Sequence, residues 1–118
     1  MYGVPADLPI QRFVGDHLAQ VRIGMDGIHF AFGNTGSISA YGTWELRDRS
    51  GNLIDCYQDQ LERESYRVHV IFNETVTVVS IDPPQSFSFD FASGHRLTVF
   101  DDGPEYESIM IMPDEIVI

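Results

Sequence analysis

The sequence between Ser86 and Phe100 reads SFSFDFASGHRLTVF, in which large apolar residues alternate with polar ones on both sides of a Ser-Gly pair. Because successive side chains of a β-strand point to opposite faces, residues two positions apart share a face. Gly94 accepts the positive φ angle that short hairpin loops require. This segment therefore predicts a β-hairpin with one apolar face, formed by Phe87, Phe89, Phe91, Leu97 and Val99.

Two registers fit this hairpin. A three-residue loop at 92–94 places Asp90 opposite Arg96, which is an oppositely charged pair across two strands. A five-residue loop instead places Phe91 opposite Leu97. Both registers keep the same apolar face, so the face is predicted while the register stays open.

A second predicted hairpin lies at Ile28–Tyr41, and its apolar positions match those of the hairpin at Ser86–Phe100 without a gap. We interpret the match as an internal duplication of one β-meander, with repeats at about 10–57 and 66–118. The alternative is that any two amphipathic hairpins look alike. The polar segment 58–65 would join the repeats, as a helix of two turns or another structured link.

Short runs of alternating or β-branched residues recur along the chain, separated by loops rich in Gly, Pro, Asp and Asn. Residues 10–14 fit either one helical turn or a short strand. Strands are expected in the central hairpin and at 17–23, 28–33, 37–42, 43–47, 53–57, 66–72, 75–81, 107–112 and 115–118.

This density of short strands predicts an all-β fold, an antiparallel sandwich or partly open barrel built from two similar β-meanders. Consecutive hairpins favour pairing of each strand with the next along the chain. The phenylalanines of the second hairpin should then meet Phe30, Phe32 and Trp44 of the first half in the core.

The length and composition indicate a single domain spanning residues 1–118, because 118 residues is near the commonest domain size and 43% hydrophobic residues is ordinary for a globular protein. No apolar run approaches the roughly 20 residues that cross a bilayer. The first residues lack the basic and apolar regions of a secretory signal. Cys56 is the only cysteine. Together these features favour the reducing cytoplasm.

The charge balance is strongly acidic. Eighteen acids oppose seven bases, all of them arginine, which gives a net charge of −11. Nucleic-acid-binding proteins carry a basic surface instead, so we expect no nucleic-acid partner. An anionic membrane surface is excluded on the same ground. A basic protein is the class of partner that this charge would attract.

Residue types that carry catalysis are scattered. Cys56 lies in a predicted strand and is expected to pack rather than react. The four histidines, His17, His29, His69 and His95, show no metal-ligand spacing, and His29 and His69 are expected to face outward. No nucleophile elbow or phosphate-binding glycine loop is present. We therefore expect no metal, no cofactor and no catalytic residue.

An acidic loop follows the central hairpin. The carboxylates of Asp101, Asp102, Glu105 and Glu107 lie within seven residues, beside Tyr106. A calcium site would use such oxygens, but the spacing is not that of an EF-hand. We instead expect Asp101, Asp102, Glu105, Tyr106 and Glu107 to contact a basic partner.

The same segment carries a resemblance. Asp101-Asp102, followed by Tyr106-Glu107-Ser108, resembles the C-terminal stretch of small bacterial all-β domains of unknown function. Ile109 departs from that pattern, in which an aromatic residue follows the serine. The resemblance implies no activity, and it fits a small bacterial partner-binding protein, a class that includes immunity proteins.

Three functions are compatible with the sequence. The first is a non-enzymatic acidic domain that binds a protein, such as an immunity or inhibitor protein that neutralises a nuclease toxin. The second is a small-ligand-binding β-barrel or an uncharacterised enzyme. The third is an assembly subunit, in which exposed strand edges pair two copies as a homodimer.

Overall fold

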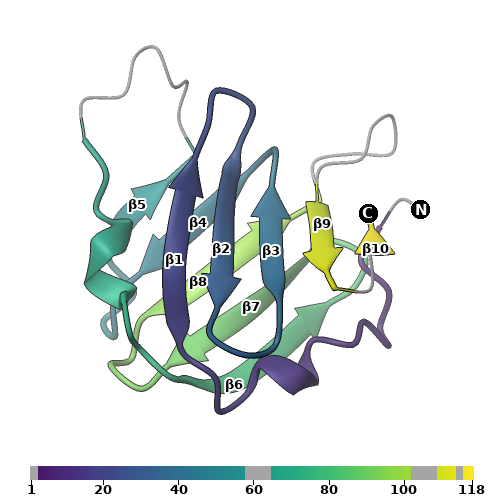
Figure 1. The fold of residues 1–118 in the computed structure, drawn as a ribbon, viewed down its shortest axis with the longest axis horizontal. Coiled ribbons are helices and arrows are strands. Elements are labelled where there is room, and N and C mark those ends of the chain that lie inside the picture. The colour runs from purple at the N-terminus through teal and green to yellow at the C-terminus, as the bar shows by residue number, and fades with distance from the viewer. Residues whose placement is uncertain (1–2, 58–64, 102–108, 114–115) are drawn as a thin grey trace.

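The computed structural model describes residues 3–57, 65–101, 109–113 and 116–118, and places them in two antiparallel sheets of five strands each (Figure 1). The sheet orders are β1-β2-β3-β9-β10 and β5-β4-β8-β7-β6. The strands are β1 (Leu18–Ile23), β2 (Ile28–Phe32), β3 (Ser37–Ala40), β4 (Trp44–Arg47), β5 (Leu53–Cys56), β6 (Val76–Asp82), β7 (Ser86–Phe91), β8 (Arg96–Phe100), β9 (Ile109–Met112) and β10 (Ile116–Val117). The all-β antiparallel prediction is confirmed, and the described strands form two open sheets rather than a closed barrel.

The alternation of apolar residues sets which face of each strand is buried. In β7, Phe87, Phe89 and Phe91 are all buried, while the acidic side chain between the last two remains partly exposed. The register between β7 and β8 places Asp90 opposite Arg96, which is the register of the three-residue loop. The hairpin and its apolar face are therefore confirmed.

The chain changes sheet twice. After β3 it crosses to the second sheet, where β4 pairs with β8, and after β8 it returns to the first sheet, where β9 pairs with β3. Each half thus supplies three strands to one sheet and two to the other. The expectation that consecutive strands pair holds within β1–β3 and β6–β8 but is wrong at these crossings. The crossings complete each three-stranded meander with two strands from the other half.

The two halves have the same order of elements. A single 3-10 turn precedes each three-stranded meander, η1 (Gln11–Phe13) before β1 and η2 (Val68–Ile71) before β6. Two exchanged strands follow each meander. The halves touch at an isolated antiparallel bridge between His17 and Thr75.

The backbone hydrogen bonds around this bridge are reciprocal. The amide of Gly15 donates to the carbonyl of Val76 at 2.8 Å, and the amide of Asn73 donates to the carbonyl of Leu18 at the same distance. The two donors, Gly15 and Asn73, have positive φ angles of 91° and 63°. An approximate twofold axis therefore passes through the bridge and relates the two halves.

Aromatic rings from both sheets fill the interior. The ring of Phe32 lies 5.6 Å from that of Phe89, and the ring of Phe30 lies 5.9 Å from Trp44. Phe13 of η1 lies 5.0 Å from Phe32. The predicted meeting of the phenylalanines of the two halves is confirmed. Edge-to-face and tilted ring pairs of this kind stabilise a core beyond the area that they bury.

The strand expected at Tyr66–Phe72 is wrong, because residues 68–71 form the 3-10 turn η2. In a helix with three residues per turn, Val68 and Ile71 lie on the same side, and both are buried, whereas His69 between them is exposed. Residues 10–14, which fitted a turn or a strand, contain the turn η1. Alternation over a few residues did not distinguish these two conformations.

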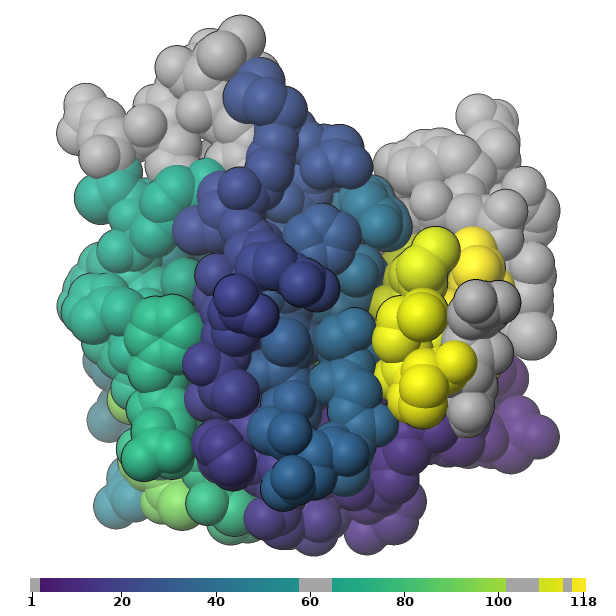
Figure 2. Space-filling model, viewed as in Figure 1, coloured from purple at the N-terminus to yellow at the C-terminus, as the bar shows by residue number. Residues whose placement is uncertain are grey.

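The segment 58–65, expected to join the halves, lies outside the described residues except for Ser65. In the part of the chain that the structure describes, no helix has the length and apolar composition to cross a membrane. Figure 2 views the outer face of the first sheet, where β1, β2 and β3 form one surface, with β9 beside β3.

Candidate functional site

Of the five residues predicted to contact a partner, only Asp101 is described. Its side chain is partly buried, and its carboxylate accepts a hydrogen bond from the amide of Gly3. Asp101 therefore helps to hold the N-terminal segment against the end of β8. The other four predicted residues lie outside the described residues: Asp102, Glu105, Tyr106 and Glu107.

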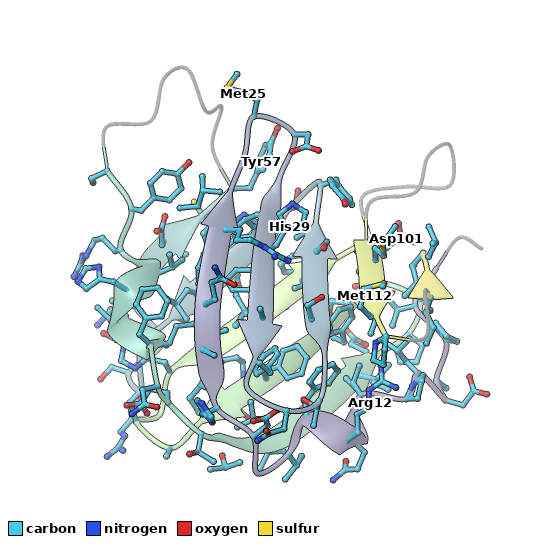
Figure 3. The ribbon with its side chains drawn as sticks, in the orientation of Figure 1. Arg12, Met25, His29, Tyr57, Asp101 and Met112 are labelled. Carbon is cyan, nitrogen blue, oxygen red and sulfur yellow. The ribbon has the colours of Figure 1, made fainter. Side chains whose placement is uncertain are left out.

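Exposed apolar side chains lie at one end of the sandwich. Met25, in the turn between β1 and β2, is 70% exposed, and Tyr57, after β5, is 52% exposed. Figure 3 shows both side chains toward the upper end of the molecule. Ile23, at the end of β1, and Asp26, in the same turn as Met25, are also exposed. We call Ile23, Met25, Asp26 and Tyr57 the end surface.

Asp16 is buried beside the twofold bridge. Its carboxylate accepts hydrogen bonds from the amides of His17, Asn34 and Thr35 and from the hydroxyl of Thr35. Burial alone would raise the pKa of Asp16, but these hydrogen bonds favour the charged form and together lower the pKa from 3.8 to about 2. The carboxylate therefore fixes the loop after β2 and serves the fold.

Two of the histidines lie within hydrogen-bond distance of a serine hydroxyl. Nδ1 of His29 lies 2.6 Å from the hydroxyl of Ser39, on the outer face of the first sheet, and Nδ1 of His95 lies 2.7 Å from the hydroxyl of Ser93. His69 is exposed. Across the described residues, no group of three His, Cys, Asp or Glu side chains is arranged to hold a metal ion.

Cys56 lies in the edge strand β5, as predicted, and is half-buried opposite Glu45 of β4. The strand placement is confirmed, and its geometry suits packing.

A hollow of about 470 Å³ opens on the outer face of the second sheet. Three of the chain's seven arginines line it, Arg47 from β4, Arg49 from the turn after β4, and Arg96 from β8. We call this the arginine hollow. The remaining lining residues are Asp48, Gly51, Thr77, Asp90, Phe91 and Gly94.

Ion pairs orient two of these arginines. The guanidinium of Arg96 donates to both carboxylate oxygens of Asp90, at 2.6 and 3.0 Å. That of Arg47 donates to both oxygens of Glu45, at 3.0 and 3.2 Å. These hydrogen bonds raise the pKa of Arg96 and of Arg47, so both guanidinium groups stay charged.

Sequence reasoning paired Asp90 with Arg96 but missed the hollow. Arg47 comes opposite Arg96 only because β4 pairs with β8, a contact between strands from different halves. The local signal is the run of charged residues at 47–49, which the sequence divides between the strand expected at 43–47 and a turn at 48–52. That turn is present, and its contribution to the hollow depends on the crossing of the chain between the sheets.

Two edge strands, β1 and β6, contain β-bulges at equivalent positions. β1 and β6 each contain a bulge near their beginning, between Leu18 and Gln20 and between Val76 and Val78. Bulges hinder pairing of an edge strand with another chain. Val78 on β6 is nevertheless 50% exposed.

The described residues thus present two surfaces with features suited to binding, the end surface and the arginine hollow. The first offers apolar side chains beside an acid, and the second offers three cationic groups in a concave site. Comparisons of the chain with protein-family models, with curated proteins and with solved structures return no match.

Proposed function

We propose that this protein is a non-enzymatic acidic domain that binds a basic protein through its end surface. The concrete form of the proposal is an immunity or inhibitor protein that neutralises a basic partner such as a nuclease toxin. The observation that carries the proposal is the exposure of Met25 and Tyr57 at the same end of a molecule whose net charge is −11.

Exposed aromatic and methionine side chains are typical of the centres of protein interfaces, which are bordered by polar residues. The acids Asp59, Glu62 and Glu64 follow Tyr57 in the sequence, and Asp26 lies next to Met25. An apolar centre beside Asp26, with further acids close to Tyr57 in the sequence, suits a partner that presents an apolar pocket bordered by Lys or Arg.

The second part of the proposed contact comes from the sequence alone. Asp102, Glu105, Tyr106 and Glu107 follow Asp101, and we propose that they extend the acidic border of the interface. Acids on such a border chiefly raise the rate of association and make it sensitive to salt. Among the described acids, Asp16, Asp48 and Asp90 instead accept hydrogen bonds within the fold.

Affinity capture with matched variants tests the proposal. The immobilised chain should retain a basic protein from the soluble fraction of its source organism at low salt and release it at high salt. The double variant Met25→Ala/Tyr57→Ala should lose that protein. Phe72→Ala is the control, because Phe72 is 45% exposed but follows η2, close to the twofold bridge. Equal retention by both variants, or no basic protein at low salt, would contradict the proposal.

The fold bears differently on the two alternative functions, a ligand-binding barrel and a homodimer. A ligand-binding barrel needs an open interior, whereas Phe30, Phe87 and Phe89 are fully buried and the last two pack edge to face. A homodimer through strand edges has one favourable observation, the exposed Val78 on β6. Light scattering over a range of concentrations tests it, since self-association raises the apparent mass.

A further inference from the structure

The fold does not require the charged residues of the arginine hollow, because the equivalent positions of the first sheet, related by the approximate twofold axis, carry uncharged residues. Phe89 pairs with Leu97 in the second sheet as Phe30 pairs with Ile38 in the first, which aligns the two sheets residue by residue. In the first sheet, Ser37 is equivalent to Arg96 and Met112 is equivalent to Arg47. Ala31 is equivalent to Asp90, and Ala19 is equivalent to Thr77. The same backbone therefore forms with small or uncharged residues.

Two of the cations are also placed where they repel each other. Arg47 and Arg96 lie directly opposite across β4 and β8, on the outer face of the sheet. Like charges at such positions destabilise a sheet. The carboxylates of Glu45 and Asp90 offset this repulsion, but each carboxylate serves one guanidinium and neither bridges the two. An anion between the arginines would relieve the repulsion directly.

Arg96 and Arg49 keep donor groups available in the hollow, whereas Nε and Nη2 of Arg47 donate to Glu45 and its Nη1 donates to the carbonyl of Gly51 at 2.9 Å. A guanidinium has five N–H donors. Asp90 engages Nε and Nη2 of Arg96, and among the described residues Nη1 makes no hydrogen bond. Arg49 donates from Nη2 to the carbonyl of Ser93 at 3.1 Å, and no described carboxylate lies within ion-pair distance of it.

Gly94 allows Arg49 to reach this position. The side chain of Arg49 crosses the turn between β7 and β8, and a Cβ atom at residue 94 would lie 2.5 Å from Nε of Arg49. Gly15, which lies outside the hollow, has a similar φ angle, 91° against 95°, but a Cβ atom there would meet no atom of another part of the chain within 4 Å. The two glycines therefore provide a matched pair for testing Arg49.

We propose that the arginine hollow binds the phosphate group of a small phosphorylated molecule. Guanidinium groups bind phosphate and carboxylate through paired hydrogen bonds. A phosphate monoester offers three acceptor oxygens and close to two negative charges, which matches three arginines better than a carboxylate does. The hollow, at about 470 Å³, is within the size range of small-molecule sites. This site is separate from the end surface.

Titration of the full chain with glycerol phosphate tests the proposal, with the Nε–Hε resonances of the arginines followed by NMR. The resonances of Arg47, Arg49 and Arg96 should shift and saturate. Arg49→Gln should weaken binding by about tenfold or more, because it removes a charge-assisted hydrogen bond. Arg22→Gln changes the net charge equally on exposed β1 and should leave the affinity unchanged.

A second pair of variants separates positioning from strain. Gly94→Ala and Gly15→Ala both place a side chain at positive φ, but only Gly94→Ala displaces Arg49 and should weaken binding of glycerol phosphate. The proposal is overturned by any of three results: shifts that do not saturate, equal affinities of Arg49→Gln and Arg22→Gln, or acetate binding as tightly as glycerol phosphate.

Discussion

Individual residues in this protein show how one buried carboxylate can organise a loop. The carboxylate of Asp16 accepts hydrogen bonds from three amides and one hydroxyl. Its counterpart in the second half, Glu74, accepts one hydrogen bond, from the amide of Ser93 at 3.0 Å. Both side chains hold the turn that follows the second strand of their meander. The difference in the number of donors makes Asp16 the more important of the two for stability.

Asp16→Asn should lower the free energy of unfolding by roughly 2 kcal/mol near neutral pH, because the amide cannot replace a charged acceptor. The folded pKa of about 2 lies below the ordinary 3.8, so the stabilising contribution is present above pH 4 and is lost as the pH falls from about 4 to about 2. Urea unfolding at neutral pH and at pH values within that interval measures both effects. Glu74→Gln is the control and should cost less; an equal cost would contradict the role given to Asp16.

At the scale of elements, the short C-terminal strand completes the first sheet. The backbones of Ile109 and Ile118 exchange two hydrogen bonds, at 2.9 and 3.2 Å, and the side chain of Ile118 is fully buried. Val117, one position earlier, is only partly buried. The sequence predicted strand at 115–118, and the structure shows why the last residues contribute to the core.

Ile118→Ala should destabilise the protein by about 2–4 kcal/mol, the usual cost of emptying a buried aliphatic site. Val117→Ala should cost less than about 1 kcal/mol, since surface substitutions seldom cost more than a few tenths. Thermal unfolding followed by circular dichroism compares the two variants. A loss for Ile118→Ala no larger than that for Val117→Ala would show that the end of the chain does not stabilise the core.

For the whole molecule, the strand exchange makes each half depend on the other. A fragment ending at Tyr57 lacks β9 and β10, and a fragment beginning at Ser65 lacks β4 and β5. Neither fragment should fold as a monomer, while an equimolar mixture should regain β-structure as a complex. Circular dichroism with sedimentation analysis checks this expectation, and a folded monomeric half would refute it.

The sequence predicted the features that depend on local alternation and missed those that depend on distant contacts. The faces of β2, β7 and β8 follow from a period of two, which is visible within a few residues. The crossings of β4 and β9, and with them the meeting of Arg47 and Arg96, depend on which strands pair across the whole chain. At 66–72 the apolar residues fit two periods, because Val68 shares one face of a strand with Val70 but one side of a 3-10 turn with Ile71.

The exchange of strands also bears on how the protein is made. Synthesis delivers β1, β2 and β3 together, but β9, the strand that pairs with β3, is made only after all the strands of the second sheet. Until then, the nascent meander exposes its phenylalanine face and the unpaired edge of β3. Exposed apolar surface and unpaired strand edges make partly folded chains prone to aggregation. Native assembly of the first sheet therefore has to wait until β9 and β10 have been made.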